Sequence, residues 1–208
     1  MQFLGIGLPC RPSSDPAAEI AVTELDTRGT VLAVEWRSDL DAVAALVAAV
    51  ATPDVVIAAG SPLCGLNRDD GRRAAIRSLR HRLALADVDS GVLECDAGSF
   101  PFPIDEFDAA RPPRLCDHSG RAASRAARLA DAADGLVRRV ALLNSAQPPL
   151  DLWTSEETAA LLTEPTPRTR AGLEHRAVLL SALLCAWGAS NWHARPEEIP
   201  LAPFPLAV

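Results

Sequence analysis

Short apolar segments separated by turn residues open the chain and predict an antiparallel sheet. The segments cover residues 3–8, 19–25 and 30–36. Asp26-Thr27-Arg28-Gly29, between the last two, is a good turn sequence. Because the segments are short and close together, they predict a meander of three antiparallel strands.

Helical and strand patterns alternate beyond this meander. Ser38 is the predicted N-cap of a helix whose apolar stripe runs from Leu40 to Val50. The apolar run from Asp54 to Ala59 is typical of a strand buried on both faces of a parallel sheet. The later predicted elements are a helix from Asp69 or Asp70, a strand over 92–95, a long helix within 119–143, and a helix over 168–191 with a regular apolar stripe. This order predicts an α/β fold with a mixed sheet.

The domain organisation is predicted to be simple. The chain has 208 residues and shows no internal repeat or linker, so we expect one domain over residues 1–195 and a Pro-rich tail over residues 196–208. The Pro-rich segment 98–113 is predicted to be a loop.

Composition narrows the range of functions. No apolar run approaches the ~20 residues needed to cross a bilayer, and the N-terminus lacks the pattern of a secretion signal, so a cytoplasmic location without membrane attachment is expected. The net charge of −7 disfavours general nucleic-acid binding but leaves local patches open. The five cysteines are widely spread and are expected to be reduced, and the histidines do not stand at zinc-ligand spacings beside them.

The segment 53–72 has the pattern of a site, because a buried strand runs into a tight loop and then a helix. The strand ends in Ala59, Gly60 and Ser61, without an acid. The candidate ligand-binding residues are Ser61, Asn67, Arg72 and Arg121.

Two arginine trios lie at helical spacing and leave two interpretations open. They are Arg73, Arg77, Arg80 and Arg121, Arg125, Arg128. Each trio is either a solvated helix face, which is the commoner case, or a remnant of phosphate recognition.

Several short motifs occur together in an order that resembles a known family. They are Gly5-Ile6-Gly7, Ala59-Gly60-Ser61-Pro62-Leu63 with Gly71-Arg72, Ser99-Phe100-Pro101, and Ser181-Ala182-Leu183-Leu184-Cys185-Ala186-Trp187. With the order of elements, they resemble the bacterial domain-of-unknown-function family four-two-nine, which is catalogued as predicted nucleases of the ribonuclease H-like fold. The resemblance covers roughly residues 3 to 195 and implies a ribonuclease H-like fold with a mixed five-stranded sheet flanked by helices.

The same resemblance implies a metal site whose acids this chain lacks. Enzymes of this fold hold divalent metal ions with carboxylates on the first strand, the fourth strand and the last helix. Those positions align with Gly7, Gly60 and Ser181, none of which supplies a carboxylate. A further acid, which the family carries before a Pro at a strand end, is also missing. The equivalent region reads Leu152-Trp153-Thr154-Ser155-Glu156, where only the later Glu156 and Glu157 are acidic.

Two functional hypotheses follow. In the first, the domain is catalytically degenerate and acts as a binding or structural module without a cofactor. In the second, it is a divergent nuclease or phosphoesterase that uses Mg²⁺ or Mn²⁺. The acids available for that second hypothesis are Asp69, Asp70, Glu94 and Asp96, which also have plain interpretations as helix-start and strand-end residues.

The apolar groups near the C-terminus raise the question of a partner. Trp187, Trp192 and the tail segment 201–206 either form a homodimer interface or cover the domain's own core. The sequence identifies no other partner.

Overall fold

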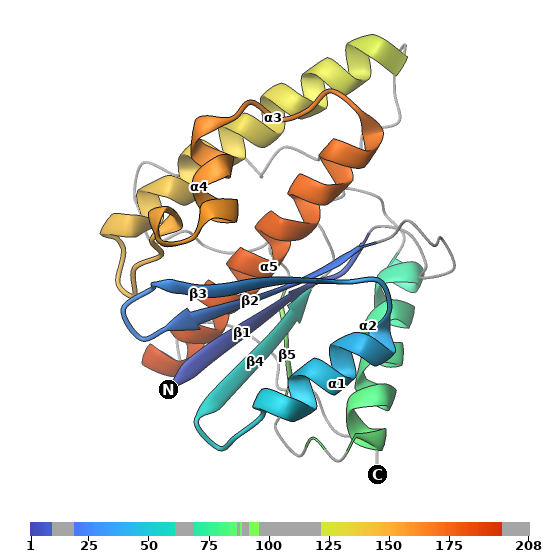
Figure 1. Cartoon of the computed structure of the whole chain (residues 1–208), viewed down its shortest axis with the longest axis vertical. Helices are drawn as coiled ribbons and strands as arrows, with labels where there is room; N and C mark the ends of the chain where they lie inside the picture. Colours follow the sequence, from blue (N-terminus) through green and yellow to red (C-terminus); the bar gives the residue numbers. More distant parts are fainter. Residues whose placement is uncertain (10–18, 61–68, 87, 89–91, 96–121, 197–208) are drawn as a thin grey trace.

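Five strands form one mixed sheet with helices on both faces (Figure 1). This is a computed structural model, and it describes residues 1–9, 19–60, 69–86, 88, 92–95 and 122–196. The strands are β1 (Gln2–Gly7), β2 (Ile20–Asp26), β3 (Val31–Arg37), β4 (Val55–Gly60) and β5 (Val92–Glu94). Their order across the sheet is β3-β2-β1-β4-β5. The predicted α/β fold with a mixed five-stranded sheet is therefore confirmed.

The pairing directions follow from the lengths of the connections. β1, β2 and β3 are antiparallel neighbours, as the short, closely spaced segments predicted. Gly29 has a positive φ of 77° in the predicted turn between β2 and β3. β4 and β5 run parallel to β1 and are reached through helical crossovers, because a parallel neighbour cannot be joined by a tight turn.

Two helices cover one face of the sheet. They are α1 (Leu40–Val50) and α2 (Asp69–Leu85). The N-cap of α1 is Asp39, whose side chain accepts a hydrogen bond from Ala42 N at 2.8 Å, so the prediction of Ser38 was one residue early. Apolar side chains from α1 and α2 pack against alternate strand residues such as Ile6 and Ile57.

The other face carries the longest helix, α5 (Arg170–Ala194), with α3 (Ala122–Leu142) and α4 (Glu156–Thr163) packed outside it (Figure 1). Two short 3₁₀ turns, η2 (Leu143–Ser145) and η3 (Leu152–Thr154), join α3 to α4. Every residue of α5 from Arg176 to Asn191 is buried. α5 is therefore the central helix of this layer.

The tryptophans that raised the question of a homodimer are used within the chain. Trp187 is fully buried and donates a hydrogen bond from Nε1 to the carbonyl oxygen of Pro148 at 2.9 Å. Trp192 is partly buried against the same core. Apart from Pro196, the tail over residues 196–208 lies outside the described residues, as does the predicted loop over 98–113. The two tryptophans cover the domain's own core.

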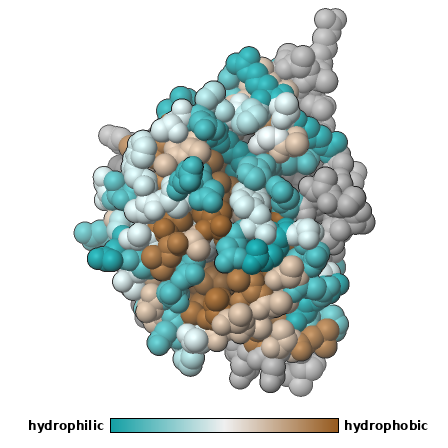
Figure 2. All heavy atoms as spheres, in the orientation of Figure 1, coloured by the Kyte–Doolittle hydropathy of each residue, from teal (hydrophilic) through white to brown (hydrophobic). Residues whose placement is uncertain are grey.

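The described surface is mixed in character. Figure 2 shows apolar groups on the viewed face, interrupted by hydrophilic residues. Among the described residues, the large apolar side chains left exposed are Met1, Leu32, Leu85, Leu142 and Trp153. No helix in the described part is both long enough and apolar enough to cross a membrane.

Candidate functional site

The three positions aligned with missing acids lie together at one end of the sheet. Gly7 and Gly60 are direct partners in the parallel pairing of β1 with β4. Ser181 lies above them on α5, fully buried, and its hydroxyl donates a long hydrogen bond of 3.5 Å to the carbonyl oxygen of Gly60. Residues that are far apart in sequence therefore meet where the resemblance implies a metal site.

The space beside the two glycines is filled by backbone and by a thiol. A Cβ atom at Gly7 would overlap the carbonyl oxygen of Val178 on α5. A Cβ atom at Gly60 would lie 2.5 Å from the carbonyl oxygen of Cys95 and 2.8 Å from Cys185 Sγ. Real Cβ atoms do not approach other atoms so closely, and a carboxylate is larger than a methyl group. The residues present do not fit a divalent metal ion.

Gly5 extends this close contact along β1. A Cβ atom there would overlap the backbone of α5 at Ala182 and Ala186. Gly5 and Gly7 are two residues apart in a strand, so they share the face that carries α5. Glycines on the strand and small residues on the helix let the two backbones touch.

One polar atom in this interface has no hydrogen bond within the described part of the chain. Thr23 on β2 pairs with Gly5 and is fully buried, but its Oγ1 has no hydrogen-bond partner there. A buried hydroxyl without a partner costs free energy.

Of the four alternative acids, only Glu94 has a described side chain, and it is half-buried at the end of β5. Its charge acts on Arg80 of α2: burial lowers the pKa of the Arg80 guanidinium, and the nearby carboxylate of Glu94 opposes that effect. Asp69 and Asp70 begin α2, as predicted, but their side chains and all of Asp96 lie outside the described residues. Within the described residues, no group of three His, Cys, Asp or Glu side chains is placed to hold a metal ion.

The candidate ligand-binding residues lie mostly outside the described part of the chain. Ser61, Asn67 and Arg121 lie outside the described residues, and Arg72 lies in α2 with a side chain that is not described. Three members of the arginine trios have described side chains. Arg77 and Arg128 are exposed, as expected for a solvated helix face, whereas Arg80 is half-buried.

The sequence interpretation missed a buried arginine on α5. Arg176 is only 5% exposed, and its Nη2 donates to the carbonyl oxygens of Leu161 at 3.0 Å and Glu164 at 2.8 Å, at the end of α4. Its Nη1 donates to Thr166 Oγ1 at 2.7 Å and approaches Asp134 Oδ1 at 3.4 Å. Burial lowers the pKa of this guanidinium, and the negative charges of Asp134 and Glu164 oppose the shift. Arg176 therefore caps α4 and joins it to α3.

A second cluster attaches the start of α5 to the sheet. The rings of His175 and Trp36 are stacked with centroids 3.9 Å apart and planes 13° apart. His175 Nδ1 lies 2.9 Å from a carboxylate oxygen of Glu19 at the start of β2. The cluster is about half exposed, so it contributes modestly to the stability of the helix end.

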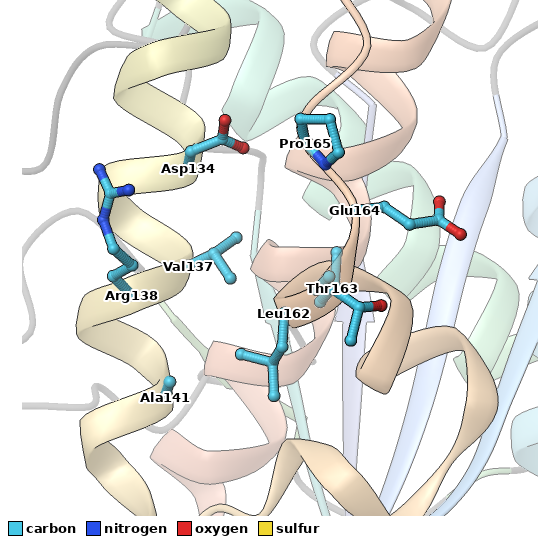
Figure 3. Close-up of a pocket in the computed structure, with 9 residues that line it drawn as sticks. Asp134, Val137, Arg138, Ala141, Leu162, Thr163, Glu164 and Pro165 are labelled. Carbon is cyan, nitrogen blue, oxygen red and sulfur yellow. The ribbon is translucent and has the colours of Figure 1, made fainter.

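A groove lies on the outer side of this layer, between α3 and the segment that follows α4 (Figure 3). Its volume is about 340 Å³. It is lined by Asp134, Val137, Arg138, Ala141 and residues 161–165. None of these residues was identified as part of a site from the sequence, although the helix that carries the first four was predicted.

Comparisons with protein-family models, with curated proteins and with solved structures found no match to this chain. The class of protein is defined by the structure alone: it is an α/β protein in which the backbone of the central helix α5 packs directly against the carboxyl end of β1.

Proposed function

We propose that this chain is a ribonuclease H-like domain that has lost its metal site and acts as a non-catalytic binding or structural module. Three antiparallel strands, a helix, and two parallel strands linked by a helix give the order of elements on which the resemblance rests. That this chain has the ribonuclease H-like fold is therefore itself part of the proposal.

The packing at Gly7 is the observation that carries this proposal. If the acids had simply been replaced, room for a carboxylate and an ion would remain. Instead, the backbone of α5 stands where a side chain of residue 7 would begin, and Cys185 Sγ stands beside Gly60. Metal-assisted hydrolysis needs several oxygen ligands around one ion, and the backbone packing leaves no room for them here.

The alternative, a divergent nuclease or phosphoesterase using Mg²⁺ or Mn²⁺, has less support. It requires Glu94 to act with Asp69, Asp70 or Asp96 around one ion. The described environment of Glu94 includes the cationic Arg80, whose charge competes with a metal ion for the carboxylate.

A titration with Mn²⁺ tests the proposal directly. Isothermal titration calorimetry of the full chain should show no stoichiometric binding, and the purified chain should not cleave single-stranded DNA, RNA or a DNA–RNA hybrid. Stoichiometric Mn²⁺ binding would overturn the proposal. If it were also abolished in a variant carrying Asp69→Asn, Asp70→Asn, Glu94→Gln and Asp96→Asn together, the alternative would replace it.

A further inference from the structure

The groove between α3 and the segment after α4 combines an apolar floor with one polar end. Val137 and Ala141 of α3 and Leu161 and Leu162 of α4 form the apolar part. Figure 3 shows Val137 and Leu162 pointing into the space between the two walls. The volume of about 340 Å³ is at the lower limit for small-molecule sites.

Asp134 forms the polar end, and its carboxylate is held in a fixed orientation. Its Oδ1 accepts hydrogen bonds from Thr166 N at 2.9 Å, from the Thr166 hydroxyl, and from Arg176 Nη1 at 3.4 Å. None of the described residues donates to Oδ2. Because an ionised carboxylate has about four acceptor positions, Oδ2 keeps capacity for a further donor. A ligand would meet an acceptor that is already positioned.

The surroundings of Asp134 favour a positively charged donor. α4 ends at this wall, where Arg176 is the buried cation that caps its last carbonyl groups. The two carboxylates of Asp134 and Glu164 outnumber that single positive charge. The next wall residue, Pro165, has no N–H group that could bind an anion. Arg138 also lines the groove, but Figure 3 shows its guanidinium group on the far side of α3, whereas Asp134 is directed toward the wall at Pro165.

We propose that this groove binds a small organic ammonium ion that carries an apolar chain or ring. The ammonium group donates to Asp134 Oδ2, and the apolar part lies along Val137, Ala141 and Leu162. The groove lies apart from Gly7 and Gly60, so this proposal stands or falls independently of the proposed function.

The probe is 2-phenylethylammonium, compared with 2-phenylethanol, which keeps the ring and chain but lacks the charge. Chemical-shift titration of the full chain should show saturable binding of the ammonium ion with a Kd on the order of 1 mM, the strength expected for so few atoms. The alcohol should bind at least tenfold more weakly.

Two substitutions locate the site. Ala141→Leu fills the groove and should weaken binding of the ammonium ion about tenfold, whereas Ala84→Leu, the same change at an exposed position of α2, should leave it unchanged. Asp134→Asn should also weaken binding, but it changes the contact with Arg176, so its unfolding curve must be measured alongside. The absence of saturable binding, equal affinity for the alcohol, or unchanged binding by Ala141→Leu would each overturn the proposal.

Discussion

Three glycines at the candidate site allow close packing because they have no side chain. Gly5 and Gly7 bring the backbones of β1 and α5 into contact, and Gly60 leaves room for Cys185 Sγ. The loss of an aspartate from a strand end is commonly taken as an empty site. In this chain the backbone of α5 occupies the space beside Gly7, so under the proposed function an aspartate placed at residue 7 alone would not create a metal site.

Gly7→Ala should therefore destabilise the fold strongly. The added methyl group overlaps the Val178 carbonyl, and overpacking of this kind costs about 1–3 kcal/mol or more. Urea unfolding followed by circular dichroism gives the free energy of unfolding.

The matched control for this change is Gly135→Ala, in the middle of α3. A Cβ atom there meets no atom within 4 Å, so the variant should gain roughly 0.5–1 kcal/mol from helix propensity. Equal stabilities of the Gly7 and Gly135 variants would contradict the close packing of α5 on β1.

Arg176 should be the most sensitive charged residue among those described. Arg176→Met keeps much of the volume but leaves Asp134 without its cation and the end of α4 without its cap. Removing one partner of a buried charge pair costs about 3–5 kcal/mol, so the variant should unfold at much lower urea.

Arg138→Met provides the comparison, because Arg138 lies on the same layer but is exposed. Its effect should stay within about 0.5 kcal/mol. If Arg176→Met were equally mild, Arg176 would not be the residue that holds α3, α4 and α5 together.

At the scale of elements, the sequence predicted the sheet better than its outer helical layer. The five strands and the helices at α1, α2, α3 and α5 follow from patterns in neighbouring residues. α4 has eight residues and a weak apolar stripe, and its stability depends on Ser155 as N-cap and on Arg176 from another helix. Ser155 followed by Glu156 and Glu157 is a local helix-start signal that the sequence interpretation did not use. The contact with Arg176 and the groove beside α4 join distant residues and leave no periodic signal.

The residues that lie together at the candidate site could be predicted, but their close packing against α5 could not. The resemblance implied that Gly7, Gly60 and Ser181 lie in one cluster, and the structure brings these residues together. The sequence could not show that α5 closes the space, because the distance between two backbones depends on the whole interface.

On β2, Glu24 should make stability depend on pH. Burial raises the pKa of Glu24, and the charge of Glu35 on the neighbouring strand raises it further. The folded state therefore disfavours the ionised form, so this residue's contribution is most favourable below the usual pKa of 4.5 and is lost as the pH rises through the raised value. Glu24→Gln should raise the free energy of unfolding by about 0.5 kcal/mol at pH 7 and should have no such effect near pH 3.

Asp26, at the end of the same strand, should behave in the opposite way. Burial alone would raise its pKa, but hydrogen bonds from Thr30 and Arg28 outweigh it and lower the pKa. The ionised form is therefore stabilising above the usual value of 3.8, and this contribution is lost as the pH falls through the lowered pKa. Asp26→Asn should destabilise the protein at pH 7, and a gain there would contradict this assignment.

At the scale of the whole molecule, α5 connects the two parts of the fold. One side contacts the sheet through Gly5 and Gly7, and the other side contacts α3 and α4 (Figure 1). α1, in contrast, buries one stripe and leaves residues such as Asp41 exposed. Local opening should therefore be easier on the face of α1 than around α5.

Native-state hydrogen exchange measures this difference. Amides of α5 from Val178 to Ser190 should exchange only when the whole chain unfolds, so their free energy of exchange should equal the global value from urea unfolding. Amides of α1 should exchange through smaller openings with a lower free energy. The Gly7→Ala variant should lower the α5 values by the full loss of stability, because α5 cannot leave β1 without exposing both layers. Exchange of α5 at a lower free energy than α1 would show that the closed end of β1 is not the stable centre of the fold.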